Sequence, residues 1–164
     1  MTIKEEELRK HRCCFTGHRP EKLHQPEWLI KMALEKEICF AIDDGFTVFI
    51  SGMSRGVDIW ASEIVLKLRS KGLPLRLICA IPHPDFEKRW DDQWQMRYKG
   101  VLESADLVRT ISPAYRRGVY QIRNEWLVDH SSRVIAVFNG QPSGTMNTIE
   151  YAIAKGVPVR IIRR

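Results

Sequence analysis

Two short turns rich in glycine and hydroxyl side chains are the most informative features of this sequence. The first covers residues 51–58 and follows the apolar run 47–50, and the second covers residues 139–145 and follows the apolar run 134–138. A strand that ends in such a turn and leads into a helix directs unpaired backbone N–H groups at one point. Both turns therefore predict phosphate binding at the carboxyl end of a strand.

The residue types in the first turn indicate how an anion would be held. Gly52 allows the chain to turn, and Gly56 allows the following helix to approach a ligand or the sheet closely. The hydroxyl groups of Ser51 and Ser54 can donate hydrogen bonds. Arg55 adds a positive charge at the mouth of the turn.

Asp58, at the end of the first turn, is open to two interpretations. An acidic residue in the first turn of a helix is favoured by the helix dipole, which is a purely structural role. A carboxylate beside a phosphate would repel it. A functional Asp58 would therefore accept a hydrogen bond from a ribose hydroxyl or from a neighbouring loop.

In the second turn, Ser143, Gly144 and Thr145 open a predicted helix. Their hydroxyl and N–H groups are well placed to cap either that helix or an anion. Asn139 could orient a base or a sugar from the end of the preceding strand, with Gly140 beside it. We include all five in the predicted ligand site.

Two further segments complete the predicted site. A short apolar run at 12–16 ends at Gly17, which permits a sharp turn or a close approach of a ligand, and Arg19 could pair with a phosphate through two hydrogen bonds. Arg123 and Asn124 lie on the helix before the fifth predicted strand. They could reach over the ligand or lie on a solvated helix face.

Aromatic side chains recur at every fourth position between residues 86 and 98. The spacing of Phe86, Trp90, Trp94 and Tyr98 predicts one stripe on a helix. Such a stripe is more typical of core packing than of a surface that stacks on bases.

Apolar runs alternate with helical patterns along the whole chain. We expect strands at 12–16, 47–50, 75–81, 106–111, 133–138 and 158–162, and helices at about 26–45, 56–70, 119–130 and 145–155. This alternation predicts an α/β, Rossmann-like doubly wound, mostly parallel sheet with helices on both faces. Ligands of such sheets bind beyond the carboxyl ends of the strands. We expect one domain at residues 12–164, preceded by a charged extension at 1–11.

The overall composition agrees with a globular protein that binds an anion. The chain has 164 residues and a net charge of +6, which suits an anionic ligand without by itself implying nucleic acid. Its first eleven residues are too charged for a signal peptide, and no apolar stretch approaches membrane-spanning length. The four cysteines form no C-x-x-C pair and no zinc site. We expect reduced thiols, a cytoplasmic location, no membrane partner, no metal and no cofactor.

The sequence resembles the YpsA-like family of the SLOG superfamily. The matching stretches are residues 14–20, 49–58, 123–124 with 128–129, and 139–148, which are spread over nearly the whole chain. The superfamily also contains DNA-processing protein A, which binds single-stranded DNA, and the Lonely Guy phosphoribohydrolases, which release a base from a nucleoside monophosphate. The resemblance implies a nucleotide or nucleotide-derived ligand and a homo-oligomer.

The chain departs from the phosphoribohydrolases at one place. Those enzymes carry acidic residues two and three positions after the threonine of their glycine-rich turn, where this chain has Asn147 and Thr148, and its first glutamate comes only at Glu150. The catalytic carboxylate is therefore not evident. Loss of such a general acid or base lowers a rate by ~10²–10⁴-fold.

Three functions remain open from the sequence. The first is a sensor or regulatory module that binds a nucleotide-derived ligand without rapid turnover. The second is an enzyme that hydrolyses the N-glycosidic bond of a nucleotide, with Asp58, Asp129 or Glu150 as the acid. The third is a protein that binds single-stranded DNA, whose affinity would fall steeply with salt.

Overall fold

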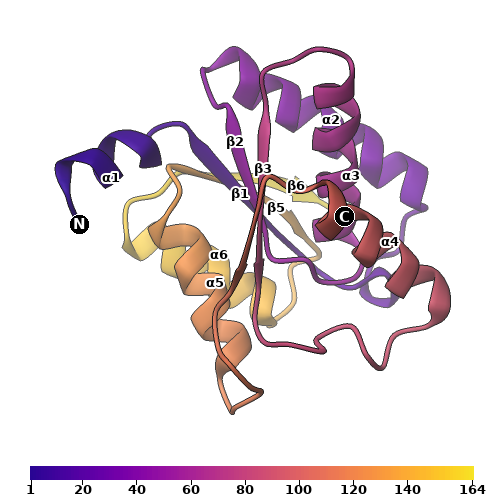
Figure 1. The fold of residues 1–164 in the computed structure, drawn as a ribbon. Coiled ribbons are helices and arrows are strands. Elements are labelled where there is room, and N and C mark those ends of the chain that lie inside the picture. Colours follow the sequence, from indigo (N-terminus) through magenta and orange to yellow (C-terminus); the bar gives the residue numbers. More distant parts are fainter.

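A single six-stranded sheet forms the centre of the protein in a computed structural model that describes residues 1–164 (Figure 1). All pairings are parallel, and the strand order is β4-β3-β2-β1-β5-β6. The strands are β1 (Arg12–Gly17), β2 (Val48–Ser51), β3 (Arg76–Ile81), β4 (Leu107–Thr110), β5 (Arg133–Phe138) and β6 (Val159–Arg163).

Helices cover both faces of this sheet. Figure 1 shows α2, α3 and α4 on one face and α1, α5 and α6 on the other. The helices are α1 (Ile3–Arg9), α2 (Glu27–Asp43), α3 (Val57–Ser70), α4 (Asp92–Ser104), α5 (Val119–Asp129) and α6 (Gly144–Ala154), with a short 3₁₀ helix at Pro20–Lys22. The predicted Rossmann-like fold class is confirmed. None of these helices combines the length and the hydrophobicity needed to span a bilayer.

The core explains why the strands read as continuous apolar runs. Successive side chains of a strand point to opposite faces, and here both faces are buried. Phe15 and Phe49 stack at 5.8 Å in a cluster of 26 buried residues that includes side chains of α2, α3 and α4. Cys14 and Ile50, their sequence neighbours, belong to a separate cluster that includes side chains of α5 and α6.

The connectivity creates a crevice at one edge of the sheet. The chain adds β2, β3 and β4 in turn on one side of β1 and then returns through α5 to place β5 on its other side. The order therefore reverses between β1 and β5. Loops that leave neighbouring strands in opposite directions at such a point leave a hollow between them.

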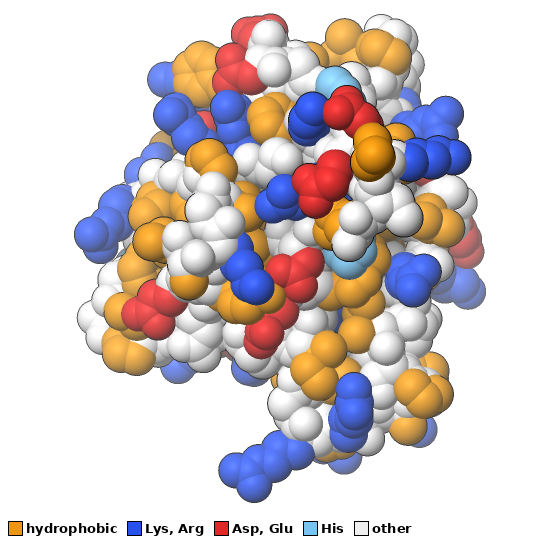
Figure 2. Space-filling model, turned by 90° about the vertical axis from the view of Figure 1, so that its left-hand side faces the viewer, with side chains coloured by type: hydrophobic (Ala, Val, Ile, Leu, Met, Phe, Trp, Pro, Cys, Tyr) orange, Lys and Arg blue, Asp and Glu red, His pale blue; other side chains and the backbone are white.

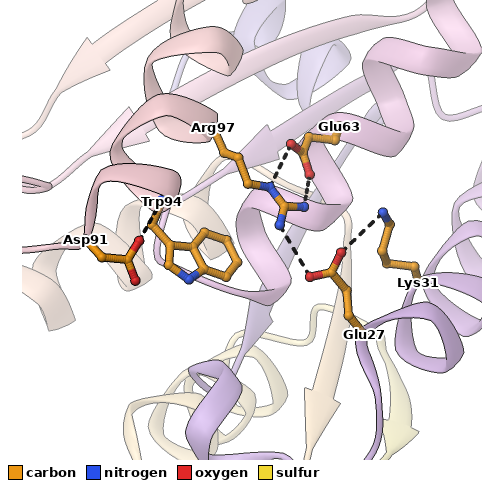
Figure 3. Close-up of polar contacts among 6 residues, drawn as sticks. All are labelled: Glu27, Lys31, Glu63, Asp91, Trp94 and Arg97. Carbon is orange, nitrogen blue, oxygen red and sulfur yellow. Dashed lines mark hydrogen bonds and ion pairs between the residues drawn. The ribbon is translucent and has the colours of Figure 1, made fainter.

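A network of charged side chains fixes α4 against α2 and α3 (Figure 3). Nε of Arg97 on α4 donates to Glu63 on α3 at 3.1 Å, and Nη1 of Arg97 donates to Glu27 on α2 at 3.3 Å. The guanidinium also lies 4.8 Å from the centre of the Trp94 ring. Separately, Asp91 caps α4 by accepting from the N–H of Trp94 at 3.0 Å, which marks where the helix begins.

The predicted aromatic stripe is wrong, because the helix begins later than the spacing suggests. Phe86 and Trp90 lie in a series of turns, and α4 starts only at Asp92. These two rings still contact Tyr98, at 6.4 Å and 5.3 Å between ring centres. Trp94, like Phe86 and Trp90, packs against the larger buried cluster, so the expected core packing is found without the continuous helix. Tertiary packing therefore brings together only part of the stripe.

The four cysteines are free thiols, as the sequence predicts. Cys13, Cys14 and Cys79 are buried in the strands, and Cys39 is partly buried. Burial raises the pKa of Cys14 and of Cys79 to about 12, so both remain protonated and unreactive at neutral pH.

The close approach of α3 to β1 yields a stability prediction. A Cβ on Gly17 would lie 2.5 Å from the side chain of Val57, which is buried, whereas a Cβ on Gly100 within α4 would meet nothing within 4 Å. We expect Gly17→Ala to lower the free energy of unfolding by about 1–3 kcal/mol through overpacking. Gly100→Ala, the matched control, should raise it by about 1 kcal/mol because alanine is the better helix former. Urea denaturation measures both, and equal effects would contradict this close approach.

Candidate functional site

A cleft of about 1270 Å³ opens at the carboxyl ends of the strands. It is lined by the loops that follow β1, β2, β3 and β4 and by the beginning of α6. The two turns predicted to bind phosphate both contribute to it, although β2 and β5 are separated in the sheet by β1. Parallel strands place all these loops at the same edge.

The cleft brings together ten of the fifteen predicted site residues. They are Gly17, Arg19, Ser54, Arg55, Asp58, Arg123, Asn124, Ser143, Gly144 and Thr145. The other five do not line it, namely Ser51, Gly52, Gly56, Asn139 and Gly140.

Ser51 and Gly52 shape the first turn from inside. The hydroxyl of Ser51 is buried, donates to the backbone carbonyl of Asp58 at 3.1 Å and accepts from the N–H of Met53 at 3.2 Å. A Cβ on Gly52 would lie 3.0 Å from the guanidinium of Arg123. Both residues therefore serve the internal packing of the turn.

Gly56, Asn139 and Gly140 shape the loops around the cleft. Gly56 has φ +89°, and a Cβ there would lie 2.8 Å from Cδ of Pro20. The amide of Asn139 donates to the carbonyl of Lys22 at 3.1 Å and so links the loops after β5 and β1. Gly140 adopts φ +89° in the tight turn before α6. These contacts are structural.

Arg123 is buried and points inward rather than over the cleft mouth. Only 4% of it is exposed. Its guanidinium donates to the carbonyl of Gly52, to the hydroxyl of Ser54 at 3.3 Å and to the side-chain oxygen of Asn124 at 2.9 Å. Burial lowers the pKa of Arg123, and the negative charge of Asp58 opposes that shift. Arg123 therefore joins α5 to the turn after β2.

Asp58 lines the cleft and carries an unpaired, buried carboxylate oxygen. The side chain is 6% exposed, and its Oδ2 accepts from the N–H of Ser54 at 3.1 Å. Oδ1 is buried and has no hydrogen-bond partner. Burial raises the pKa of Asp58 to about 6, while the charge of Arg123 and the hydrogen bond from Ser54 act in the opposite direction. A ligand donor would satisfy Oδ1.

His18 is a lining residue that the sequence analysis missed. It is 6% exposed, its ring stacks on Phe138 at 5.6 Å, and its Nε2 has no hydrogen-bond partner. Burial lowers the pKa of His18, and the nearby charge of Lys22 adds to this effect. The available signal was its position directly after Gly17 at a strand end, which a lone histidine often occupies for structural reasons.

The beginning of α6 supplies the backbone donors that the second turn predicts. The hydroxyl of Ser143 caps the helix by accepting from the N–H of Met146 at 3.2 Å. The N–H groups of Gly144 and Thr145 lie in the first turn of α6, where the helix itself offers them no acceptor. Both residues line the cleft. A Cβ on Gly144 would meet only the amide nitrogen of Asn124, at 4.0 Å. These donors are therefore open to a ligand.

Positive charge predominates around the cleft. Arg19, Lys22, Lys88 and Arg89 line it, and none of them forms an ion pair within the protein. Arg55 differs from them, because it is held 2.8 Å from Glu21. The unpaired charges would attract an anion.

Only one of the three acids considered for hydrolysis lies in the cleft. Asp58 lines the cleft. Asp129 does not line it and accepts a hydrogen bond of 2.8 Å from the hydroxyl of Tyr151, and Glu150 is exposed on α6. Any hydrolysis through one of these three acids would therefore depend on Asp58.

Comparison with known proteins identifies a family. A family model described as YpsA, the YspA SLOG family, matches residues 13–157. A UPF0398 protein of Halalkalibacterium halodurans is 29% identical over 139 residues, which cover 80% of this chain and 74% of that protein. A UPF0398 protein of Bacillus pumilus is 30% identical over 139 residues, which cover 79% and 74% respectively.

Two solved structures share the fold. DNA processing protein A from Helicobacter pylori, in a structure that describes its single-stranded DNA binding mode, aligns with a TM-score of 0.64 and 18% identity over 99% of this chain and 69% of that chain. DNA processing protein A from Streptococcus pneumoniae aligns with a TM-score of 0.67 and 17% identity. The alignment covers 96% of this chain and 52% of the pneumococcal chain, so this chain spans about half its length.

The burial of Asp58 predicts how stability depends on pH. Its pKa rises from 3.8 to about 6 on folding. Between these values the folded state keeps a proton that the unfolded state has lost, so stability falls as the pH rises from about 4 to about 6, by on the order of 3 kcal/mol. Asp58→Asn cannot ionise and should lack this fall.

Urea denaturation of both proteins between pH 4 and pH 7 measures this effect. The free energy of unfolding of Asp58→Asn minus that of the native protein should increase as the pH rises, whatever its sign at pH 4. Contributions from His18 and other groups cancel in the difference. A difference that stays constant across this range would contradict the burial of an ionisable Asp58.

Proposed function

Because the chain belongs to the YspA SLOG family, we propose that its cleft binds a nucleotide or a nucleotide-derived ligand and acts as a sensor or regulatory module. One observation carries the proposal. The free first-turn amides of α6, an unpartnered carboxylate oxygen and four unpaired basic side chains all line one hollow at the carboxyl edge of a parallel sheet. Nucleotides present both an anion and hydroxyl donors, so they match this combination.

The arrangement assigns a part of the ligand to each group. The N–H groups of Gly144 and Thr145 and the guanidinium of Arg19 would hold a phosphate. The carboxylate of Asp58 would repel a phosphate, so its Oδ1 would accept from a ribose hydroxyl. The two roles are compatible because Asp58 lies in the first turn of α3 after β2, whereas Gly144 begins α6 after β5.

Hydrolysis of a nucleotide is a second candidate, and the pKa of Asp58 favours it. A carboxyl group with a pKa of about 6 can donate a proton near neutral pH, as a general acid must. Incubation with AMP and assay for free adenine separates catalysis from binding. The sensor reading expects binding with no sustained release of base. Sustained release of adenine that Asp58→Asn abolishes would instead support the hydrolase and contradict the sensor.

Single-stranded DNA is a weaker candidate. The DNA processing protein A of Helicobacter pylori, which has the same fold, binds single-stranded DNA. Figure 2 shows the face that carries α1, α5 and α6, where basic, acidic and hydrophobic side chains are interspersed. A groove that follows a nucleic-acid backbone needs continuous positive charge, so this face does not support one.

Substitution of Gly144 tests the phosphate end of the proposal. Gly144→Val places a branched side chain at the open amides, and its Cβ would approach no protein atom more closely than the Asn124 amide at 4.0 Å, so the fold should remain while the anion is excluded. We expect AMP, ADP or ADP-ribose at about 100 times its dissociation constant to stabilise the native protein by ~2.7 kcal/mol. The stabilisation appears as a ligand-induced rise in melting temperature, which should disappear in Gly144→Val and persist in the control Gly100→Ala.

Thermal melting with and without each ligand measures the effect. A Gly144→Val protein that is stabilised as strongly as the native one would show that the phosphate lies elsewhere. The absence of stabilisation of the native protein by every nucleotide would overturn the proposed function itself.

A further inference from the structure

Five aromatic side chains form one side of the cleft, and the phosphate-binding turns do not include them. This aromatic wall consists of His83, Phe86, Trp90, Tyr115 and Tyr120. Its members come from the segment after β3 and from the segment between β4 and the first turn of α5. The stripe that the sequence suggested contains only two of them.

The rings form a continuous, angled surface around His83. The His83 ring lies 5.5 Å from that of Tyr115 and 5.9 Å from that of Phe86, edge-on to both. Tyr120 lies 5.7 Å from Phe86 and 6.1 Å from Tyr115. Edge-on and tilted pairs at these distances are favourable arrangements for aromatic rings.

Hydrogen bonds fix the two segments that carry the wall. Nδ1 of His83 lies within hydrogen-bond distance of the carbonyl of Pro84, at 2.7 Å, and its Nε2 lies 3.5 Å from the hydroxyl of Tyr120. The N–H of Ser112 donates to the carbonyl of Pro82 at 3.0 Å, which ties the turn before Tyr115 to the segment after β3. Contacts within the protein therefore hold the wall in position.

The outer rings remain accessible inside the hollow. Tyr115 is 64% exposed and Tyr120 is 45% exposed, whereas His83 at their base is buried. Accessible aromatic surface in a concave site is typical of a place where a ligand packs. Lys88 and Arg89, both without ion-pair partners, extend from the same segment and line the cleft beside the wall.

The wall and the α6 amides belong to different parts of the cleft lining, and α5 joins them. Tyr120 on α5 belongs to the wall, and the amide of Asn124, one turn later, lies 4.0 Å from the Cβ position of Gly144. The wall follows β3 and β4, and α6 follows β5. In the strand order, β3 and β5 are separated by three strand spacings of about 4.8 Å, or roughly 14 Å. One ligand that contacted both the wall and the α6 amides would carry a flat ring for the first and an anionic group for the second.

We propose that the aromatic wall is the base-binding half of the cleft, with Tyr115 and Tyr120 stacking on the nucleobase of the ligand. This proposal rests on the proposed function, because it assumes that the phosphate lies at the beginning of α6. It restricts the ligand to nucleotides with an aromatic base and excludes a bare sugar phosphate as the full ligand. Stacking accepts any base, so hydrogen-bonding groups elsewhere would select among bases.

Isothermal titration with matched probes tests this assignment. The probes are AMP, GMP, CMP, UMP and ribose 5-phosphate, which has the phosphate and sugar without a base. The variants are Tyr115→Ala and Tyr120→Ala, with Tyr115→Phe and Tyr120→Phe as controls that keep the ring. Because both tyrosines are substantially exposed, the variants should fold, which urea denaturation checks.

We expect the native protein to bind at least one nucleotide more tightly than ribose 5-phosphate. Each alanine variant should lose about tenfold in affinity for that nucleotide and keep its affinity for ribose 5-phosphate, and each phenylalanine variant should bind like the native protein.

The other outcomes distinguish this inference from the proposed function. Unchanged nucleotide affinity in both alanine variants would overturn the stacking and leave nucleotide binding intact. Ribose 5-phosphate binding as tight as that of every nucleotide would also overturn the stacking, and the phosphate site would stand. Failure of every nucleotide to bind the native protein would overturn both.

Discussion

A buried guanidinium holds the candidate site together. Arg123 belongs to α5, which covers one face of the sheet, and it donates hydrogen bonds to Gly52 and Ser54, in the turn that leads into α3 on the other face. The contact therefore joins the two helical layers around the carboxyl edge of the sheet. A buried positive charge is costly unless hydrogen bonds and an opposite charge compensate for it. The carbonyl of Gly52 and the carboxylate of Asp58 provide that compensation.

The same arrangement gives the cleft its chemistry. Arg123 and Asp58 form no direct ion pair, so Arg123 only partly offsets the burial that raises the pKa of Asp58. One oxygen of Asp58 accepts a hydrogen bond from the turn, and the other is buried without a partner. A single packing constraint thus produces both a rigid turn and an unsatisfied acceptor. In a buried site such an acceptor raises the affinity for a ligand that can donate to it and lowers the affinity for one that cannot.

The fold could be predicted from the sequence because parallel strands with two buried faces are continuous apolar runs. β5 has the bounds 133–138 that its run indicates. The segment before α4 could not be predicted in this way. Its aromatic residues recur at every fourth position, which is typical of a helix. Asp91 nevertheless caps the helix, so Phe86 and Trp90 lie in turns before it. The short α1 carries no apolar periodicity and was not predicted.

The candidate site was only partly predictable, because glycine has several uses that look alike in a sequence. Gly17 makes room for Val57, and Gly56 makes room for Pro20, whereas Gly144 leaves open space in the cleft. The neighbour that decides each case comes from another part of the chain. The aromatic wall was missed for the same reason, since its two segments meet only when β3 and β4 pair.

Selectivity for the proposed ligand would come from groups that the fold holds in place rather than from exposed charges. Ion pairs between a ligand and solvated side chains such as Lys88 and Arg89 contribute roughly 0–1 kcal/mol each and are screened by salt. They attract anions of every kind and distinguish few. The helix amides, the unpartnered oxygen of Asp58 and the ring faces of the wall are fixed before a ligand arrives and are shielded from water to differing degrees. Each recognises a different chemical group, so only a ligand that combines a phosphate, a hydroxyl donor and a ring would satisfy all three.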